Sequence, residues 1–223
     1  MTTTISLAGK NVLVTGATGG LGGAVVDAFV AAGAVVYVPT RRAVPVGAKA
    51  APATDVTNES EVVALFAAVP ALWASVHVVG GFTMGPLLDT TLHDVNKQLD
   101  INFVSAFLCT REAARKMIGS GGGRIVNVAS HAGETAPAQM AAYASSKAAV
   151  IALSRSAANE LRTARVLVNA VAPTVIDTPA NRAAMPNADR ALWASPQSIA
   201  SSIVWLCSTE NESGSGSVVT VGG

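Results

Sequence analysis

Tyr143 and Lys147 are the two residues of this sequence whose types and spacing are best suited to moving a proton. They lie four positions apart in an Ala-rich segment typical of a helix, so both side chains should lie on one face, with the ammonium beside the phenol. A phenol with a pKa of about 10 exchanges its proton near neutrality only if about 4 kcal/mol is supplied. A cation about 4.5 Å away supplies about 3.7 kcal/mol at an effective dielectric constant of about 20. The pair therefore predicts a general acid/base, with a half-exposed packing pair as the alternative.

Ser130 lies thirteen residues before Tyr143 and follows an apolar run, residues 125–128, that is typical of a buried strand. Ligands of open α/β sheets bind at the carboxyl ends of the strands, which is where this hydroxyl is placed. Ser130 and the Tyr143–Lys147 pair are therefore predicted to share one site. His131 follows directly and is interpreted as pocket lining, because no carboxylate is placed to orient its ring.

Short β-branched runs alternate with longer Ala-rich segments along the chain, which is typical of βαβ units that form a parallel sheet. The predicted strands are residues 12–15, 35–38, 76–79, 125–128, 167–171 and 218–221, with a short one near 49–51. The predicted helices are residues 21–32, 59–68, 92–118, 143–162 and 196–206, each with apolar residues at i, i+3 and i+4. We expect one α/β domain over residues 1–223, a Rossmann-type doubly wound parallel sheet with helices on both faces and a short substrate loop at about 178–195.

The stretch Thr15-Gly16-Ala17-Thr18-Gly19-Gly20-Leu21-Gly22 directly follows the first predicted strand and opens the first helix. Three glycines in such a loop serve a tight turn, the approach of backbone to a pyrophosphate and the packing of helix on strand, while the helix N-terminus attracts the phosphate charge. Gly16, Gly20 and Gly22 fit these roles. The loop therefore predicts dinucleotide binding, with a plain strand-to-helix turn as the alternative. A P-loop is excluded, because no Gly-Lys-Ser/Thr follows.

The spacing Thr-Gly-x3-Gly-x-Gly, together with Tyr-x3-Lys, resembles the classical short-chain dehydrogenase/reductase family, and the resemblance extends over the whole chain. Four residues match the active-site pattern of that family: Asn102, Ser130, Tyr143 and Lys147. The resemblance implies that Tyr143 is the general acid/base and that Lys147 lowers its pKa and binds the nicotinamide ribose. It also implies that Ser130 holds the substrate oxygen and that Asn102 supports a water relay.

The resemblance implies a nicotinamide dinucleotide as the cofactor. The expected cofactor-binding residues are Thr15, Gly16, Thr18, Gly20, Leu21, Gly22, Arg41, Asp55, Val56, Gly80, Tyr143, Lys147, Pro173 and Thr178. Two positions depart from the family pattern: Val78-Val79-Gly80-Gly81 stands where Asn-Asn-Ala-Gly is usual, and Thr174 replaces the glycine of Pro-Gly-x3-Thr. The retained glycine and Thr178 should still let backbone lie against the cofactor and hold its carboxamide.

The end of the second predicted strand favours NADP over NAD. NAD-specific relatives place a carboxylate there for the ribose hydroxyls. This chain has Thr40-Arg41-Arg42 instead, and its only acid between Gly22 and Asp55 is Asp27, inside the first helix. A guanidinium binds a phosphate through two parallel hydrogen bonds, so Arg41 is expected to contact the 2′-phosphate. NAD is the alternative, with the arginines as a solvated loop.

We expect hydride transfer between nicotinamide C4 and a small carbonyl or alcohol substrate, with Tyr143 handling the proton. A first alternative is reduction of a quinonoid pterin, because residues 177–193 and the turn Gly80-Gly81-Phe82 locally resemble dihydropteridine reductase. Arg41 and Ser130 are differences from that enzyme, which uses NADH and lacks the active-site serine. A second alternative is a regulator that binds a dinucleotide without catalysis, which would leave Ser130, Tyr143 and Lys147 without a role.

Composition limits the partners. Lys and Arg total 15 against 14 Asp and Glu, so the formal charge of +1 predicts no nucleic-acid or membrane partner and favours a small molecule. No apolar run is long enough to cross a membrane and no secretory signal is apparent, so a cytoplasmic location is expected. Cys109 and Cys207 lack metal-ligand spacing, so no metal site is predicted and both should be buried thiols. Only 13% of residues are charged, which favours a homo-oligomer, dimer or tetramer, that covers apolar surface.

Overall fold

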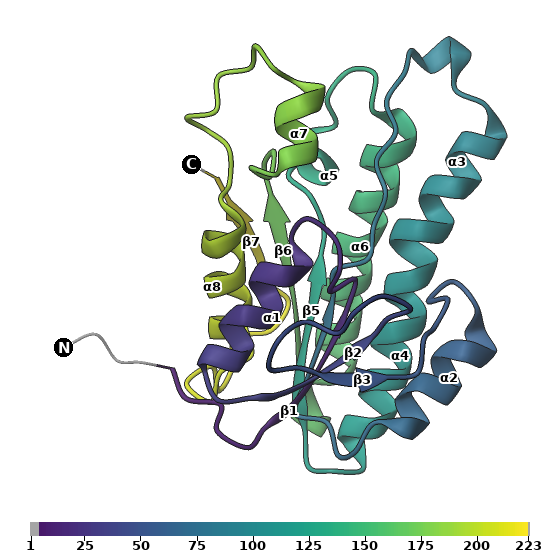
Figure 1. The fold of residues 1–223 in the computed structure, drawn as a ribbon. Coiled ribbons are helices and arrows are strands. Elements are labelled where there is room, and N and C mark those ends of the chain that lie inside the picture. The colour runs from purple at the N-terminus through teal and green to yellow at the C-terminus, as the bar shows by residue number, and fades with distance from the viewer. Residues whose placement is uncertain (1–4, 223) are drawn as a thin grey trace.

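The computed structural model describes residues 5–222, which contain a seven-stranded parallel sheet of order β3-β2-β1-β4-β5-β6-β7 (Figure 1). The strands are β1 (Asn11–Thr15), β2 (Val35–Pro39), β3 (Lys49–Ala51), β4 (Ala74–His77), β5 (Gly123–Val128), β6 (Val166–Pro173) and β7 (Val218–Val221). The chain reverses its direction of travel across the sheet between β1 and β4, which is the switch point where open α/β sheets bind ligands. The predicted doubly wound, Rossmann-type α/β fold is confirmed.

Helices cover both faces of the sheet (Figure 1). The α-helices of the described residues are α1 (Gly22–Ala31), α2 (Glu59–Ala68), α3 (Leu92–Gln98), α4 (Ser105–Ile118), α5 (Ala132–Thr135), α6 (Ala141–Glu160), α7 (Pro179–Ala184) and α8 (Pro196–Leu206). Helices α1 and α8 pack on one face, where Val14 and Ile199 are part of one core cluster. Helices α2 and α4 pack on the other, where Leu13 and Met117 belong to a second. Leu13 and Val14 point to opposite faces because side chains alternate along a strand.

The segment predicted as one helix over residues 92–118 is divided by a π-helical turn. Helix α3 is followed by the turn Leu99–Val104 and then by α4. A capping box starts the run, because the Thr91 hydroxyl accepts from the Asp94 amide at 3.2 Å while the Asp94 carboxylate accepts from the Thr91 amide at 3.0 Å. Asn102 lies inside the π-helical turn, a type of irregularity that is frequent at functional sites.

Two predicted boundaries are wrong. Strand β4 ends at His77, so Val78 and Val79, predicted as strand, lie in the turn that follows. The stretch 178–195, predicted as a loop, contains α7, which begins because the Thr178 hydroxyl accepts from the Asn181 amide at 3.2 Å and Pro179 occupies the first helical position.

The loops at the carboxyl edge of the sheet are joined to one another by backbone hydrogen bonds. The Val78 amide donates to the Thr15 carbonyl at 3.2 Å, which links the loops after β4 and β1. The His131 amide donates to the Pro173 carbonyl at 3.0 Å, which links the loops after β5 and β6. Residues from four strands are thereby held at one edge. Within residues 5–222, no helix has both the length and the apolar character needed to cross a membrane.

Candidate active site

Lys147 lies in the second turn of α6 with only 5% of its surface exposed. Its ammonium donates to the carbonyl of Val128, the last residue of β5, at 2.9 Å. Burial disfavours the charged form and lowers the pKa of Lys147 to about 8. The amine is therefore fixed against the end of the central sheet.

Tyr143 lies one turn earlier on the same helix, as the spacing of four predicts. Burial raises the pKa of its phenol, and a hydrogen bond with the Ser130 side chain acts in the opposite direction. The expectation that Lys147 lowers the pKa of Tyr143 stays a prediction, because burial and Ser130 are the two influences on this phenol. Burial is the larger of the two influences, so the phenol pKa is raised overall.

Ser130 follows β5 at the carboxyl edge and is buried. Its hydroxyl accepts from the Ala132 amide at 3.2 Å, at the start of α5. Helix α5 lies so close to α6 that a Cβ on Gly133 would be 2.8 Å from the Lys147 carbonyl carbon. This close packing brings Ser130 to the helix that carries Tyr143.

A carboxylate lies near the ring of His131 without a hydrogen bond to it. Glu134 Oε2 lies 3.6 Å from His131 Nδ1, one helical turn further along α5. The same carboxylate oxygen accepts from the Thr220 hydroxyl at 3.1 Å. His131 Nδ1 has no hydrogen-bond partner among the described residues, so this carboxylate, although only three residues away, does not orient the imidazole.

Asn102 is almost completely buried, with 1% of its surface exposed. Its side-chain oxygen accepts from the Gly81 amide at 3.0 Å. Its side-chain nitrogen donates to the Gly81 carbonyl at 3.0 Å, to Gln98 at 3.2 Å and to the Ser146 hydroxyl at 3.0 Å. The amide thus joins the turn after β4 to helices α3 and α6.

Gly80 marks the point where this turn meets Lys147 and Asn102. A Cβ on Gly80 would lie 2.8 Å from Asn102 Oδ1 and 3.2 Å from Lys147 Nζ. No side chain fits there, which gives a physical reason for glycine at this position. Asn102, Gly80 and Lys147 are therefore brought together, and Tyr143, on the same helix as Lys147, meets the Ser130 side chain from the loop after β5.

The glycine-rich loop has the close contacts expected of a cradle for a pyrophosphate. Gly16 has a φ of 75°, and a Cβ there would lie 2.7 Å from the Val79 amide nitrogen. A Cβ on Gly20 would lie 2.9 Å from Thr178 Cγ2, and one on Gly22 would overlap Gly16 and Ala17. No side chain of residues 5–222 caps the N-terminus of α1, which leaves amide groups for a phosphate. These residues fit a dinucleotide.

The remaining predicted cofactor residues differ in exposure. Thr15, Leu21, Val56, Pro173 and Thr178 are buried, whereas Thr18 and Arg41 are exposed. Asp55 accepts from the Thr57 amide at 2.9 Å and from the Thr57 hydroxyl at 2.7 Å. These bonds, and to a smaller extent the charge of Arg41, hold the pKa of the Asp55 carboxyl below its usual value.

Comparison with known proteins identifies the family of this chain. The family model for short chain dehydrogenases matches residues 10–189. The chain belongs to the short-chain dehydrogenase family. It is 31% identical over 243 residues to the 3-oxoacyl-acyl-carrier-protein reductase FabG of Aquifex aeolicus, with 98% of each chain covered.

Two further similarities cover different shares of the chain. An uncharacterised short-chain type dehydrogenase/reductase, y4vI of Sinorhizobium fredii, is 36% identical over 184 residues, which are 77% of this chain but only 33% of that protein. The structure of a short-chain type dehydrogenase/reductase from Mycobacterium ulcerans superposes with a TM-score of 0.90 at 28% identity, covering 97% of this chain and 90% of that one.

Three residues of this short-chain dehydrogenase were missed or left without a role by the sequence analysis. Gln98 accepts from Asn102 and donates to the Thr83 hydroxyl at 3.1 Å. Ser146 donates to the Tyr143 carbonyl at 2.7 Å and accepts from Asn102. The ring of Phe82 packs against that of Tyr143, with centroids 4.9 Å apart. The position of Gln98 four residues before Asn102 is the signal that sequence offered.

Proposed function

We propose that this protein is an NAD(P)H-dependent oxidoreductase that transfers a hydride between nicotinamide C4 and a small carbonyl or alcohol substrate, with Tyr143 as the general acid/base. The observation that carries the proposal is the convergence of Lys147 and Asn102 on Gly80, next to the Ser130–Tyr143 pair. The similarity to a 3-oxoacyl reductase supports a carbonyl substrate.

Each of these side chains has a definable task in carbonyl reduction. The bound dinucleotide supplies the hydride to the carbonyl carbon. Tyr143 gives its proton to the carbonyl oxygen, and a phenol is in the protonated form that this task needs at neutral pH. Ser130 holds the same oxygen. Lys147 donates one of its three N–H groups to the Val128 carbonyl, and its other two can donate to the ribose hydroxyls.

Asn102 has a positioning task in addition to the expected support of a water relay. Its two N–H donors face three acceptors, and its oxygen already accepts from Gly81. We propose that Asn102 positions the turn after β4 on which the nicotinamide would lie.

NADP(H) is the preferred cofactor in this proposal. Arg41 and Arg42 are exposed in the loop after β2, and the Thr40 hydroxyl accepts from the Arg42 amide at 2.9 Å, which shapes this loop. Thr40 itself is half-buried where an NAD-specific protein would carry its carboxylate. In this proposal the exposed guanidinium of Arg41 binds the 2′-phosphate.

A homo-oligomer, dimer or tetramer, is also proposed. Leu87, Leu88 and Leu92 are exposed near α3, and Trp205 is exposed on α8. Large apolar side chains exposed on a chain with few charges favour self-association, because a second copy would remove them from water. Light scattering that shows only monomers would contradict this part of the proposal.

The proposed activity is tested by following oxidation of NADPH or NADH with a panel of ketones, aldehydes, quinones and quinonoid dihydropterin. Tyr143→Phe should lower kcat by about 10²- to 10⁴-fold with cofactor Kd changed by only a few fold. Tyr37→Phe is the matched control, because the chain has only these two tyrosines. Turnover that survives in Tyr143→Phe would remove Tyr143 from its role. Fastest turnover of the pterin, with little effect of Ser130→Ala, would favour a pteridine reductase.

A further inference from the structure

The loop from Gly81 to Gly85 is a short arch that is fixed at both ends. Asn102 binds both backbone groups of Gly81 at 3.0 Å. The Gly85 amide donates at 2.8 Å to the carbonyl of Gln139, just before α6. An arch held at two points by backbone bonds presents its side chains in defined directions.

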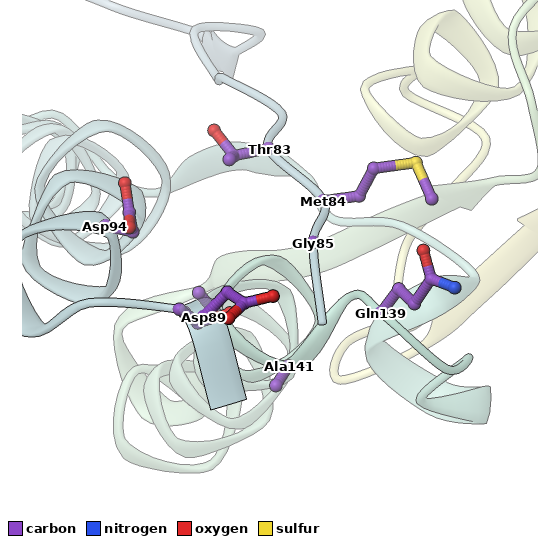
Figure 2. A pocket seen from close by; sticks show the side chains of 9 residues that line it. Thr83, Met84, Gly85, Asp89, Asp94, Gln139 and Ala141 are labelled. Atoms are coloured by element: carbon purple, nitrogen blue, oxygen red, sulfur yellow. The ribbon is translucent and has the colours of Figure 1, made fainter. Parts of the chain in front are cut away.

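The side chains of the arch point to alternate sides. Thr83 points toward α3, where its hydroxyl accepts from Gln98 at 3.1 Å. Figure 2 shows Thr83 and Met84 on opposite sides of the loop. Phe82 points toward α6, and its ring meets that of Tyr143 edge-on at 81° with a centroid distance of 4.9 Å.

Phe82 and Met84 remain exposed in these positions, at 56% and 52% of their surfaces. The edge-on pair with Tyr143 uses only part of the Phe82 ring, so apolar surface of this ring is open beside the phenol. An aromatic ring recognises a second ring better than a saturated group of the same size, and the thioether of Met also favours aromatic contacts.

We propose that Phe82 is a specificity-determining residue that selects substrates whose carbonyl is attached to an aromatic ring. This inference rests on the proposed function and adds the substrate class to it. The substrate ring packs on Phe82, with Met84 on the same arch, and its carbonyl oxygen reaches the hydroxyls of Tyr143 and Ser130. Phe82 acts on binding of the ring and takes no part in proton transfer.

The test compares acetophenone with cyclohexyl methyl ketone, which carry the same methyl ketone on a flat and on a saturated ring. For each variant, the measured quantity is the ratio of the two kcat/KM values. Phe82→Leu should lower this ratio by about 2- to 10-fold, whereas Phe82→Tyr, which keeps the ring, should hold it within about 2-fold. Leu88→Ala is the control for loss of an exposed apolar side chain, since Leu88 is 97% exposed on the neighbouring turn. Cofactor Kd, measured for every variant, should stay constant.

The outcomes separate this inference from the proposed function. If the wild type reduces ketones through Tyr143 but Phe82→Leu leaves the ratio unchanged, the role of Phe82 is wrong and the oxidoreductase stands. If Phe82→Leu and Leu88→Ala lower the ratio equally, the effect is not specific to the ring, and the inference is again overturned. If the wild type reduces neither these ketones nor any other carbonyl, both proposals are wrong.

Discussion

The amide of Asn102 brackets Gly81, because its oxygen accepts from the Gly81 N–H and its nitrogen donates to the Gly81 C=O, each at 3.0 Å. The π-helical turn Leu99–Val104 places this amide, and the turn after β4 is held in one conformation as a result. The position of Phe82 and the approach of Gly80 to Lys147 both depend on that turn.

Asn102→Leu should therefore destabilise the protein. The substitution leaves the partly buried backbone groups of Gly81 without their Asn102 partners, which costs about 1–3 kcal/mol. Urea unfolding followed by circular dichroism measures this free energy. Asn96→Leu is the matched control, because Asn96 is exposed on α3. Equal free energies of unfolding for the two variants would contradict a stabilising role of the two Asn102–Gly81 hydrogen bonds.

Lys147 should make stability depend on pH in the alkaline range. Its pKa is about 8 in the folded protein against 10.5 as the ordinary value, so the unfolded chain binds more protons between these pH values. Stability contributed by this residue therefore rises with pH from about 8 to about 10.5, by about 3 kcal/mol. Lys147→Met should remove this rise, whereas Lys97→Met on α3 should keep it. Parallel stability curves for wild type and Lys147→Met would show that the pKa is not lowered.

His77 should make stability depend on pH in the acid range. Its ring lies 2.7 Å from Asn127 Oδ1 and 2.9 Å from the Ser75 hydroxyl, and burial lowers its pKa to about 4 from 6.5. Between these values the unfolded chain binds more protons, so stability falls as pH decreases from about 6.5 to about 4, by about 3 kcal/mol. Urea unfolding at a series of pH values measures this loss of stability. His77→Gln should reduce the loss, whereas His93→Gln, at an exposed position, should not.

Arg41→Ile should weaken NADPH by about 10- to 100-fold and leave NADH nearly unchanged, because a charge-assisted bond to phosphate is lost. Addition of Thr40→Asp should reverse the preference, since the new carboxylate accepts from ribose hydroxyls and repels the phosphate. Isothermal titration with both cofactors measures the effect, and Arg42→Ile shows whether the neighbouring arginine contributes. Raised salt should weaken NADPH more than NADH. The NADP preference would be contradicted if the wild type prefers NADH or if salt affects both cofactors equally. The arginines would then belong to a solvated loop without a role in cofactor choice.

Local sequence was sufficient for the features of this protein that depend on near neighbours. The apolar runs at β1, β5 and β6, the glycine-rich loop before α1, and the shared helix face of Tyr143 and Lys147 all follow from periodicity and turn chemistry. Each of these features is set by residues within a few positions of one another, so propensity and spacing carry the information.

Only the tertiary structure decided the features that join distant segments. The π-helical turn that orients Asn102 toward Gly81, 21 positions away, brings a buried amide to partners on two other elements. The direction of the Tyr143 pKa depends on how deeply α6 is buried, and spacing along the helix does not contain that quantity. Phe82 reaches Tyr143 because backbone bonds at Gly81 and Gly85 fix the arch between them. Long-range packing and desolvation act between residues far apart in the chain, and for that reason the three-dimensional fold alone determines them.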